Sequence, residues 1–154
     1  MARAKAPFSS FSPASFPLPR VLFSARTILE PVSDTLHSIY PVLTVREHLE
    51  LSAELRGCTP RVDELLEEVG LSYAAELPGR HLSTGMRARL KFALAIQAEP
   101  PVIMFDEPGA GLDAAGRAMI GEVIEKRRAK TAFILATNDP EERRFATHEL
   151  ELGE

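Results

Sequence analysis

Two adjacent carboxylates, Asp106 and Glu107, directly follow the apolar run of residues 102–105, Val-Ile-Met-Phe. A short apolar run flanked by prolines predicts a strand buried in a parallel sheet. Open α/β sheets bind ligands at the carboxyl ends of their strands. At such an edge Asp106 can hold Mg²⁺ through water, and Glu107 can polarise a water molecule that attacks a γ-phosphate. A solvent-exposed turn with two acidic residues would have the same pattern, so this motif alone does not establish a site for Mg²⁺ and catalysis.

Two further motifs lie on either side of these carboxylates in the sequence. In residues 82–86, Leu-Ser-Thr-Gly-Met, Ser83 and Gly85 at a helix start leave backbone N–H groups free for a phosphate, which the helix dipole also attracts. A capping serine and a turn glycine explain the same residues without a ligand. In residues 109–113, Gly-Ala-Gly-Leu-Asp, the glycines permit a tight loop and Asp113 can cap the next helix. Capping is a sufficient explanation for Asp113 by itself.

The elements that position these motifs alternate between helix and strand. Thr44 and Glu47 form a capping box for a helix that runs to Arg56. A second helix is expected to begin with Thr59 as cap and Pro60 at its first position, and a third to span residues 84–98. Asp113 caps a long helix to residue 130. A buried strand at 131–137, a short helix opening at residue 140 and a last strand at 149–152 complete the pattern.

Strand-helix-strand order predicts an α/β fold with parallel strands. We expect residues 26–154 to form the folded part, with a helical subdomain over about 42–98 and the strand-rich half over 99–154. We expect residues 1–25 to be a disordered leader, because they contain three basic residues and no acidic one, and they are rich in proline and serine. The favoured explanation is unrelated sequence ahead of a truncated gene, and an organellar transit peptide is the alternative.

The overall composition argues against several classes of protein. The 154 residues suffice for one domain, and a formal net charge of −4 argues against a nucleic-acid partner. A single cysteine, Cys58, cannot form an internal disulfide, so a reducing compartment fits. The sequence has no apolar run near the ~20 residues of a membrane span, so any membrane role requires a partner.

Together the motifs resemble those of the ATP-binding cassette (ABC) ATPase family. Residues 82–86 resemble the signature motif in its Met-ending, exporter-type form, 102–108 resemble Walker B with the adjacent glutamate, and 111–113 resemble the D-loop. Residues 40–49 resemble the segment after the Q-loop in transporter cassettes. The resemblance covers about residue 28 to the C-terminus, and it implies a partial P-loop NTPase (RecA-like) core with an α-helical signature subdomain.

The resemblance also implies a mechanism. Two cassettes pair head to tail, and each ATP lies between the Walker A loop of one and the signature of the other. The implied nucleotide contacts are Ser83, Thr84, Gly85 and Met86, with Asp113 linking the two sites. Asp106 would support Mg²⁺ and Glu107 would be the general base. The implied cofactors are ATP and Mg²⁺, and the implied partners are a second ABC ATPase domain and a transmembrane permease, which would hold the chain at the cytoplasmic side of a membrane.

The sequence departs from the family pattern at three places. Walker A requires a Gly-Lys pair, and the 154 residues contain none. The only glutamine is Gln97, which is not at the Q-loop position. The switch histidine is replaced by Asn138, which can hydrogen-bond a phosphate but cannot carry a proton. Some exporter-type cassettes, including ones similar to a haem-exporter subunit, tolerate asparagine at this position. Without the Walker A strand and helix, we expect an open sheet edge and exposed apolar surface.

Three functions remain open from the sequence. The favoured one is an ABC transporter ATP-binding subunit, here a truncated chain that is nearly inactive alone. The second is a non-enzymatic half that donates its signature motif to a complete cassette; the presence of Asp106 and Glu107 argues mildly against it. The third, a soluble ABC ATPase of the repair or translation type, is disfavoured because the chain has neither a long coiled coil nor paired cassettes.

Overall fold

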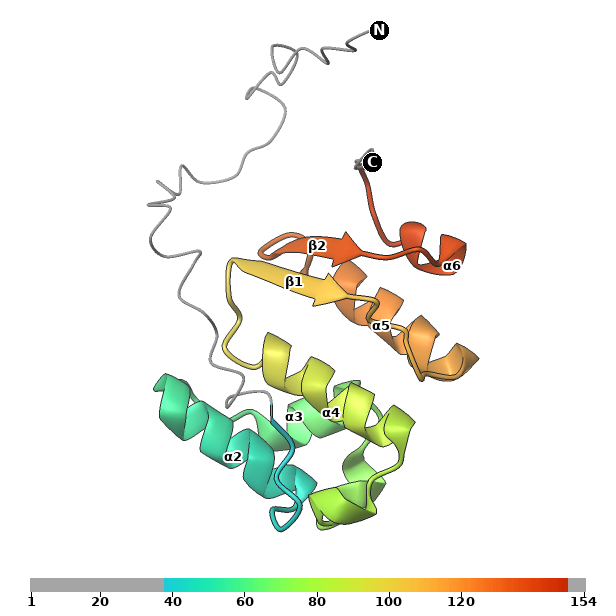
Figure 1. The fold of residues 1–154 in the computed structure, drawn as a ribbon. Coiled ribbons are helices and arrows are strands. Elements are labelled where there is room, and N and C mark those ends of the chain that lie inside the picture. Colours follow the sequence, from blue (N-terminus) through green and yellow to red (C-terminus); the bar gives the residue numbers. More distant parts are fainter. Residues whose placement is uncertain (1–37, 150–154) are drawn as a thin grey trace, which may run out of the picture. The chain divides into compact units, whose positions relative to one another are not determined.

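A computed structural model describes residues 38–149 of the chain, all within one compact unit. Figure 1 shows a group of helices followed by alternating strands and helices. The elements, in chain order, are α2 (Val45–Arg56), α3 (Val62–Glu68), the 3₁₀ turns η4 (Ser72–Ala74) and η5 (Gly79–His81), α4 (Thr84–Ile96), β1 (Val102–Asp106), α5 (Ala114–Arg127), β2 (Ala132–Ala136) and α6 (Pro140–Arg143). The leader at 1–25 and nearly all of the expected strand at 149–152 lie outside the described residues. The predicted domain boundaries stay predictions.

Local capping signals position α2 as the sequence predicts. Thr44 Oγ1 accepts a hydrogen bond from the Glu47 N–H at 3.2 Å, and Glu47 Oε2 accepts one from the Thr44 N–H at 2.7 Å. Gly57 ends the helix in the left-handed region with φ of 63°, a conformation that costs glycine little. The reciprocal bonds satisfy two backbone donors at the helix start, which confirms the predicted capping box.

The predicted start of α3 is wrong. The helix begins at Val62, two residues after Pro60, and neither Thr59 nor any other side chain caps it. The residue before the helix, Arg61, instead donates a hydrogen bond to the Gln97 carbonyl at 3.1 Å and pairs with Glu99 at 2.7 Å. These contacts to the end of α4 favour a non-helical backbone at Arg61, so a tertiary interaction overrides the local signal.

The helices α4 and α5 begin where the sequence predicts and end a few residues earlier. Ser83 caps α4 by accepting from the Met86 N–H at 3.2 Å, and Asp113 caps α5 by accepting from the Gly116 N–H at 2.7 Å. Their ends at Ile96 and Arg127 fall short of the expected ends at residues 98 and 130. End positions are weakly encoded because the last turn of a helix frays easily.

The two strands form a parallel pair, which confirms the predicted fold class. Val102 lies opposite Ala132 and Asp106 lies opposite Ala136, with the register unbroken between them. Because both strands run in the same direction, their carboxyl ends meet at one edge of the sheet. Asp106 and the residues that follow β2 are therefore brought to the same place.

Among residues 38–149, other elements cover only one face of this sheet. Figure 1 shows α4 and α5 on one side of the strand pair. On the other face, Met104 is 68% exposed and Ile134 is 50% exposed. The prediction of buried strands is therefore wrong for these two side chains, whereas apolar surface is exposed, as expected. The inward side chains are Ile103, Phe105, Phe133 and Leu135.

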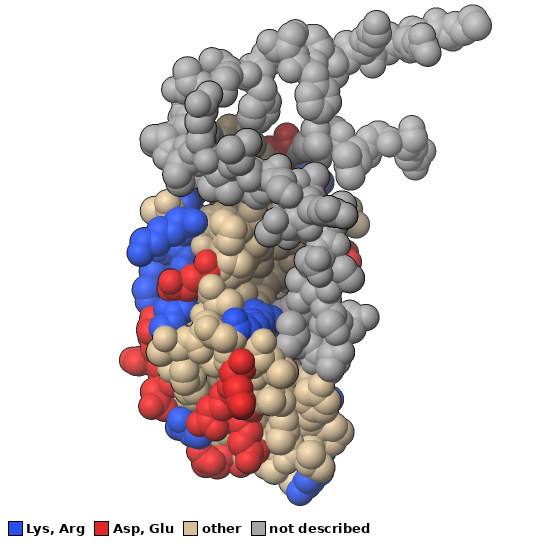
Figure 2. All heavy atoms as spheres, turned by 90° about the vertical axis from the view of Figure 1, so that its left-hand side faces the viewer, with Lys and Arg blue, Asp and Glu red and all other residues tan. Residues whose placement is uncertain are grey.

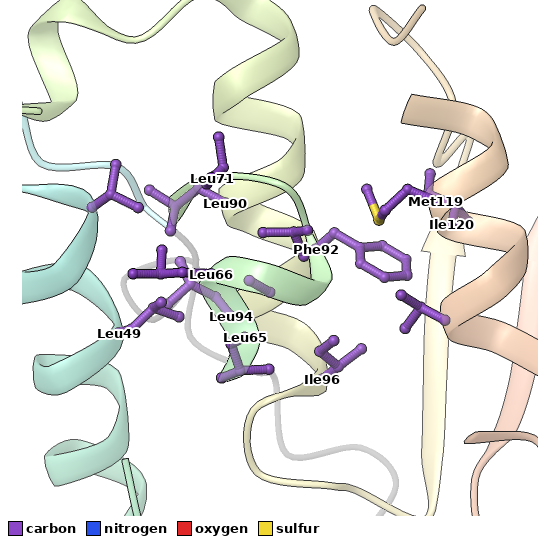
Figure 3. Packing of buried hydrophobic residues seen from close by; sticks show 14 of the residues in the cluster. Leu49, Leu65, Leu66, Leu71, Leu90, Phe92, Leu94, Ile96, Met119 and Ile120 are labelled. Atoms are coloured by element: carbon purple, nitrogen blue, oxygen red, sulfur yellow. The ribbon is translucent and has the colours of Figure 1, made fainter. Parts of the chain in front are cut away.

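One hydrophobic core joins the helical region to the strands. Figure 3 shows Leu49, Leu65 and Leu66 at one end of this core and Met119 and Ile120 at the other. Between them, the side chain of Phe92 on α4 stacks on Phe105 of β1, with ring centroids 4.8 Å apart. Burial of such side chains is the main favourable term in folding. The core therefore fixes α4 against the strand that ends in Asp106. Because α4 begins within the signature-like residues 82–86, we call it the signature helix.

The surface of the described residues carries charged side chains of both signs (Figure 2). On the face in Figure 2, acidic and basic side chains lie among uncharged areas. Arg46, for example, pairs with Asp63 at 2.9 Å and with Glu76 at 3.0 Å. Exposed pairs of this kind contribute little to stability. Within residues 38–149 no helix has both the length and the apolar character to cross a membrane.

Candidate functional site

The two carboxylates of the candidate site lie at the end of β1. Asp106 is the last residue of the strand, and Glu107 follows it with a positive φ of 44°. The Glu107 N–H donates to the Ala136 carbonyl of β2 at 2.8 Å, which fixes the first residue beyond the strand. A side-chain-bearing residue rarely adopts positive φ, because its Cβ crowds the backbone. Both side chains are exposed, so they are free to meet a ligand at this edge.

Asn138, which the sequence motifs place at the switch position, follows β2 at the same edge of the sheet. The strand ends at Ala136, and Thr137 Oγ1 accepts a hydrogen bond from the Asp139 N–H at 3.0 Å across Asn138. Asp139 then caps α6 by accepting from the Glu141 N–H at 2.8 Å. These two local bonds hold the backbone on either side of Asn138, whose side chain is exposed.

The loop after Glu107 is built from two successive turns. The Ala110 N–H donates to the Glu107 carbonyl at 2.9 Å, and the Leu112 N–H donates to the Gly109 carbonyl at 3.0 Å. Gly111 takes a positive φ of 75°, which favours glycine at this position. The loop therefore passes directly from the carboxylate pair to the cap of α5.

The start of the signature helix lies against this loop. A Cβ on Gly111 would stand 3.0 Å from Thr84 Cγ2, and a Cβ on Gly85 would stand 3.5 Å from the Gly111 carbonyl oxygen. Ser83 and Thr84 are exposed, and Met86 is half-buried against the core. Among the described residues, a Cβ on Gly85 would therefore make only ordinary contacts. The structure thus brings residues 83–86 beside the loop of Asp113.

Arg89, which the sequence motifs did not single out, bridges α4 to this loop. Its guanidinium donates to the Val69 carbonyl at 3.0 Å and to Asp113 Oδ1 at 3.4 Å. The same Asp113 oxygen accepts the Gly116 N–H at 2.7 Å. The predicted capping role of Asp113 is confirmed, and the contact with Arg89 adds a link to the signature helix. An arginine six residues after Ser83 on a helix was the only signal available in the sequence.

The hydrogen bond from the Gly116 N–H, aided by the nearby Arg89 charge, lowers the pKa of Asp113 below its usual value. A carboxyl group with a lower pKa in the folded state stabilises the fold above its unfolded pKa, and this contribution disappears as pH falls through the folded pKa. We therefore expect Asp113→Asn to flatten the acid side of the stability profile. Asparagine caps helices as well as aspartate does, so the helix start should survive. Urea unfolding between pH 3 and 7, monitored by circular dichroism, measures this; an unchanged acid slope would contradict the assignment.

The carboxylates fit a magnesium ion that arrives with its nucleotide. Within the described part of the chain, no three His, Cys, Asp or Glu side chains gather as a metal site. Mg²⁺ commonly keeps several waters and takes one or two carboxylates together with substrate phosphates. Asp106, exposed at the end of β1, matches this pattern, and Glu107 is exposed beside it. Bound there, Mg²⁺ would neutralise phosphate charge, while the chain itself supplies the carboxylates that orient it.

Gln97 and Glu142 have roles that the sequence did not reveal. Gln97 is buried, and its Nε2 donates to the Leu49 carbonyl at 2.7 Å, so it ties the end of α4 to α2. This position supports the prediction that Gln97 is not the Q-loop residue. Glu142 is buried beneath the loop of residues 107–112 and accepts the Gly109 N–H at 2.7 Å. Nothing in the local sequence distinguishes it from the exposed Glu141 beside it.

Comparison with known proteins identifies the family. The family model described as ABC transporter matches residues 23–110. The cytochrome c biogenesis ATP-binding export protein CcmA of Hyphomonas neptunium is 37% identical over 99 residues, which are 64% of this chain and 51% of that protein. The aliphatic sulfonates import ATP-binding protein SsuB of Bacillus subtilis is 36% identical over 118 residues, 74% of this chain and 46% of that protein.

The solved structures that resemble this chain are ABC ATP-binding proteins, like the relatives found by sequence. An ATP-binding subunit of an ABC transporter matches with a TM-score of 0.60 and 32% identity, covering 65% of this chain and 44% of that chain. A dimeric ATP-binding cassette in a post-hydrolysis state with ADP and phosphate matches with a TM-score of 0.63 and 26% identity, covering 71% and 52%. The chain spans about half the length of these relatives. It has a partial P-loop NTPase fold, and it belongs to the ABC transporter ATP-binding family.

Proposed function

We propose that the chain provides the signature and Walker B half of an ATP-hydrolysing subunit of an ABC transporter. The observation that carries the proposal is the continuous path from the carboxylates at the end of β1, through the loop of residues 107–112, to the start of the signature helix. In this path the loop joins carboxylates suited to Mg²⁺ and water at one end to a helix start at the other, where Ser83 and Thr84 are exposed. These 154 residues contain no Gly-Lys pair of the kind that cradles a nucleotide.

Each candidate residue has a separate role in this proposal. Asp106 supports Mg²⁺ through water, and Glu107 accepts the proton of the attacking water. Asn138 hydrogen-bonds the γ-phosphate from β2 without taking up a proton. The residues that approach a nucleotide held by the partner cassette are Ser83, Thr84, Gly85 and Met86. Asp113 connects these two places, because it caps α5 and contacts Arg89 of the signature helix.

The proposed partners are a second ABC ATPase domain and a membrane permease. The match to a dimeric cassette with ADP and phosphate supports pairing of two such domains. The signature residues Ser83 and Thr84 are exposed, as contact with a second domain requires. The proposed location is the cytoplasmic side of a membrane, reached through the permease.

A second candidate function is donation of the signature motif to a complete cassette. It is favoured by two observations: Ser83 and Thr84 of the signature motif are exposed, and the 154 residues contain no Gly-Lys pair. In this case Ser83 would act in trans on a nucleotide held elsewhere, and Glu107 would have no catalytic part. Replacement of Glu107 separates the two candidates.

The first experiment measures ATP hydrolysis by the assembly that co-purifies with the chain from its host. Ser83→Arg places a long cationic side chain where the phosphate must approach, so we expect a loss of about 100-fold or more, as for removal of a transition-state contact. Glu122→Gln, on the exposed side of α5, is the matched control and should leave the rate unchanged. Unchanged hydrolysis with Ser83→Arg would refute both candidate functions.

The isolated 154-residue chain should bind ATP weakly. Without a phosphate loop, few backbone N–H groups enclose the β- and γ-phosphates. We expect titration calorimetry with Mg²⁺ and ATP to give a dissociation constant well above the micromolar range. A micromolar constant for this chain would show that another segment replaces the phosphate loop. The intact mass of the protein from its host is the companion measurement, because a mass well above 16.9 kDa would show an additional segment.

A further inference from the structure

A buried carboxylate that the proposed mechanism does not use lies beneath the candidate site. Glu142, on the short helix α6, is only 2% exposed. Its Oε1 accepts a hydrogen bond from the Gly109 N–H at 2.7 Å, and its Oε2 has no hydrogen-bond partner among the described residues. Burying a carboxylate with one oxygen unsatisfied costs stability. A residue that is costly to bury is a candidate for a positional role.

The contact between Glu142 and Gly109 is close and leaves no room for a side chain at residue 109. A Cβ on Gly109 would overlap Glu142 Oε1 and would stand 3.2 Å from Arg117 Cγ. The absence of a side chain at Gly109 therefore lets the Glu142 carboxylate reach the backbone. Arg117 also donates to the Leu112 carbonyl at 2.8 Å, which closes the other side of the loop.

Two hydrogen bonds thus hold the backbone on both sides of the Glu107 left-handed turn. The Glu107 N–H donates to the Ala136 carbonyl, and two residues later the Gly109 N–H donates to Glu142. Both acceptors belong to the segment that carries Asn138. A strained conformation such as φ of 44° at Glu107 persists only where its surroundings over-determine it. The hydrogen bond from the Gly109 N–H to Glu142 is the part of this restraint on the Glu107 backbone that a side chain supplies.

We propose that Glu142 is a positioning residue that holds the Glu107 backbone in its left-handed conformation and couples it to the switch segment at Asn138. The inference rests on the proposed function for its relevance to hydrolysis, because it assigns Glu107 the role of general base. Glu142 acts through the Gly109 N–H and does not contact the nucleotide. Movement of the switch segment would therefore be transmitted to the loop between Glu107 and Asp113.

Amide hydrogen exchange of the full chain, resolved by nuclear magnetic resonance, tests the constraint without any nucleotide. In Glu142→Ala the Gly109 N–H loses its charged acceptor, so we expect its exchange to accelerate by about tenfold or more, with chemical-shift changes at Glu107. Glu142→Gln keeps a side-chain oxygen acceptor and should restore much of the protection. The neighbouring Glu141→Gln, on the exposed side of α6, is the matched control and should change neither signal.

A second variant covers the case in which Glu142→Ala does not fold. Gly109→Ala displaces the carboxylate from the other side of the same bond, and it should give the same shift changes at Glu107. Faster exchange confined to residues 107–112, with rescue by glutamine, supports the proposal. Unchanged Gly109 exchange, or acceleration of all amides alike including those of Leu90 and Leu66, would overturn it.

Hydrolysis by the assembled protein separates this inference from the proposed function. Glu142→Ala should lower kcat by about tenfold while changing the KM for ATP little, since the loss falls on the orientation of Glu107. If exchange at Gly109 behaves as expected but no assembly containing the chain hydrolyses ATP, the positional role stands and the proposed function fails. If hydrolysis is present and Glu142→Ala leaves kcat unchanged, the coupling to Glu107 fails.

Discussion

Glu107→Gln is expected to reduce ATP hydrolysis by the assembled ATPase by about 100-fold or more while leaving ATP binding intact, because general-base catalysis commonly contributes factors of this size. Glutamine has nearly the same shape as glutamate but cannot accept the proton of the attacking water. The backbone at residue 107 should not move, since its N–H is held by the Ala136 carbonyl and not by its own side chain. The readouts are kcat and the equilibrium binding of ATP.

The result distinguishes the two candidate functions. Loss of hydrolysis with retained binding supports a chain that supplies its own catalytic carboxylate. Undiminished hydrolysis, together with a loss in Ser83→Arg, would show that the chain donates only its signature motif. Glu122→Gln serves as the control for removal of a negative charge, because it lies on the exposed surface of α5. A loss of ATP binding in Glu107→Gln would instead show that this carboxylate contributes mainly to holding Mg²⁺.

Arg127→Ala is expected to lower the free energy of unfolding by about 3 kcal/mol, near the lower end of the range for breaking a buried ion pair. Arg127 and Glu68 are the last residues of α5 and α3, and their side chains are 11% and 7% exposed. The guanidinium donates to both carboxylate oxygens, with 2.7 Å to Oε2. Lys126, 3.3 Å from Glu68, remains in the variant and moderates the loss. Urea unfolding followed by circular dichroism measures the change.

Two variants control for this prediction. Arg128→Ala removes the next arginine, whose pair with Glu125 is exposed, and should cost less than about 1 kcal/mol. The double variant Glu68→Met with Arg127→Met removes both charges and should recover much of the loss, because apolar replacement of a buried pair is commonly near neutral. If Arg127→Ala and Arg128→Ala cost the same, α3 and α5 are not held together by the buried pair.

The sequence was a good guide to the local starts of most helices. Thr44, Ser83 and Asp113 each accept a hydrogen bond from an N–H group in the first turn, as their types and spacing predict. Such bonds join residues two or three apart, so their information is contained in a few consecutive letters. Thr59 is the exception, since the backbone ahead of α3 is held by Arg61 contacts with the distant end of α4.

Burial of the strands was predicted less well. The apolar runs of β1 and β2 indicate buried strands, and yet Met104 and Ile134 are exposed. A hydrophobic run reports how well a segment tolerates burial, and it does not report which other elements cover it. Only the arrangement of α4 and α5 on one side of the sheet decides which side chains are buried.

The sequence alone determined the family and the parallel α/β class, and it supplied the candidate site residues, because each motif is a short run whose spacing fixes the positions of its groups. The tertiary structure decided how these runs meet: the carboxylates of β1 lie beside the segment of Asn138, and the signature helix lies against the loop of Asp113. It also decided the roles of Arg89 and Glu142. Their partners Asp113 and Gly109 lie 24 and 33 residues away along the chain, a separation over which no local pattern specifies contact.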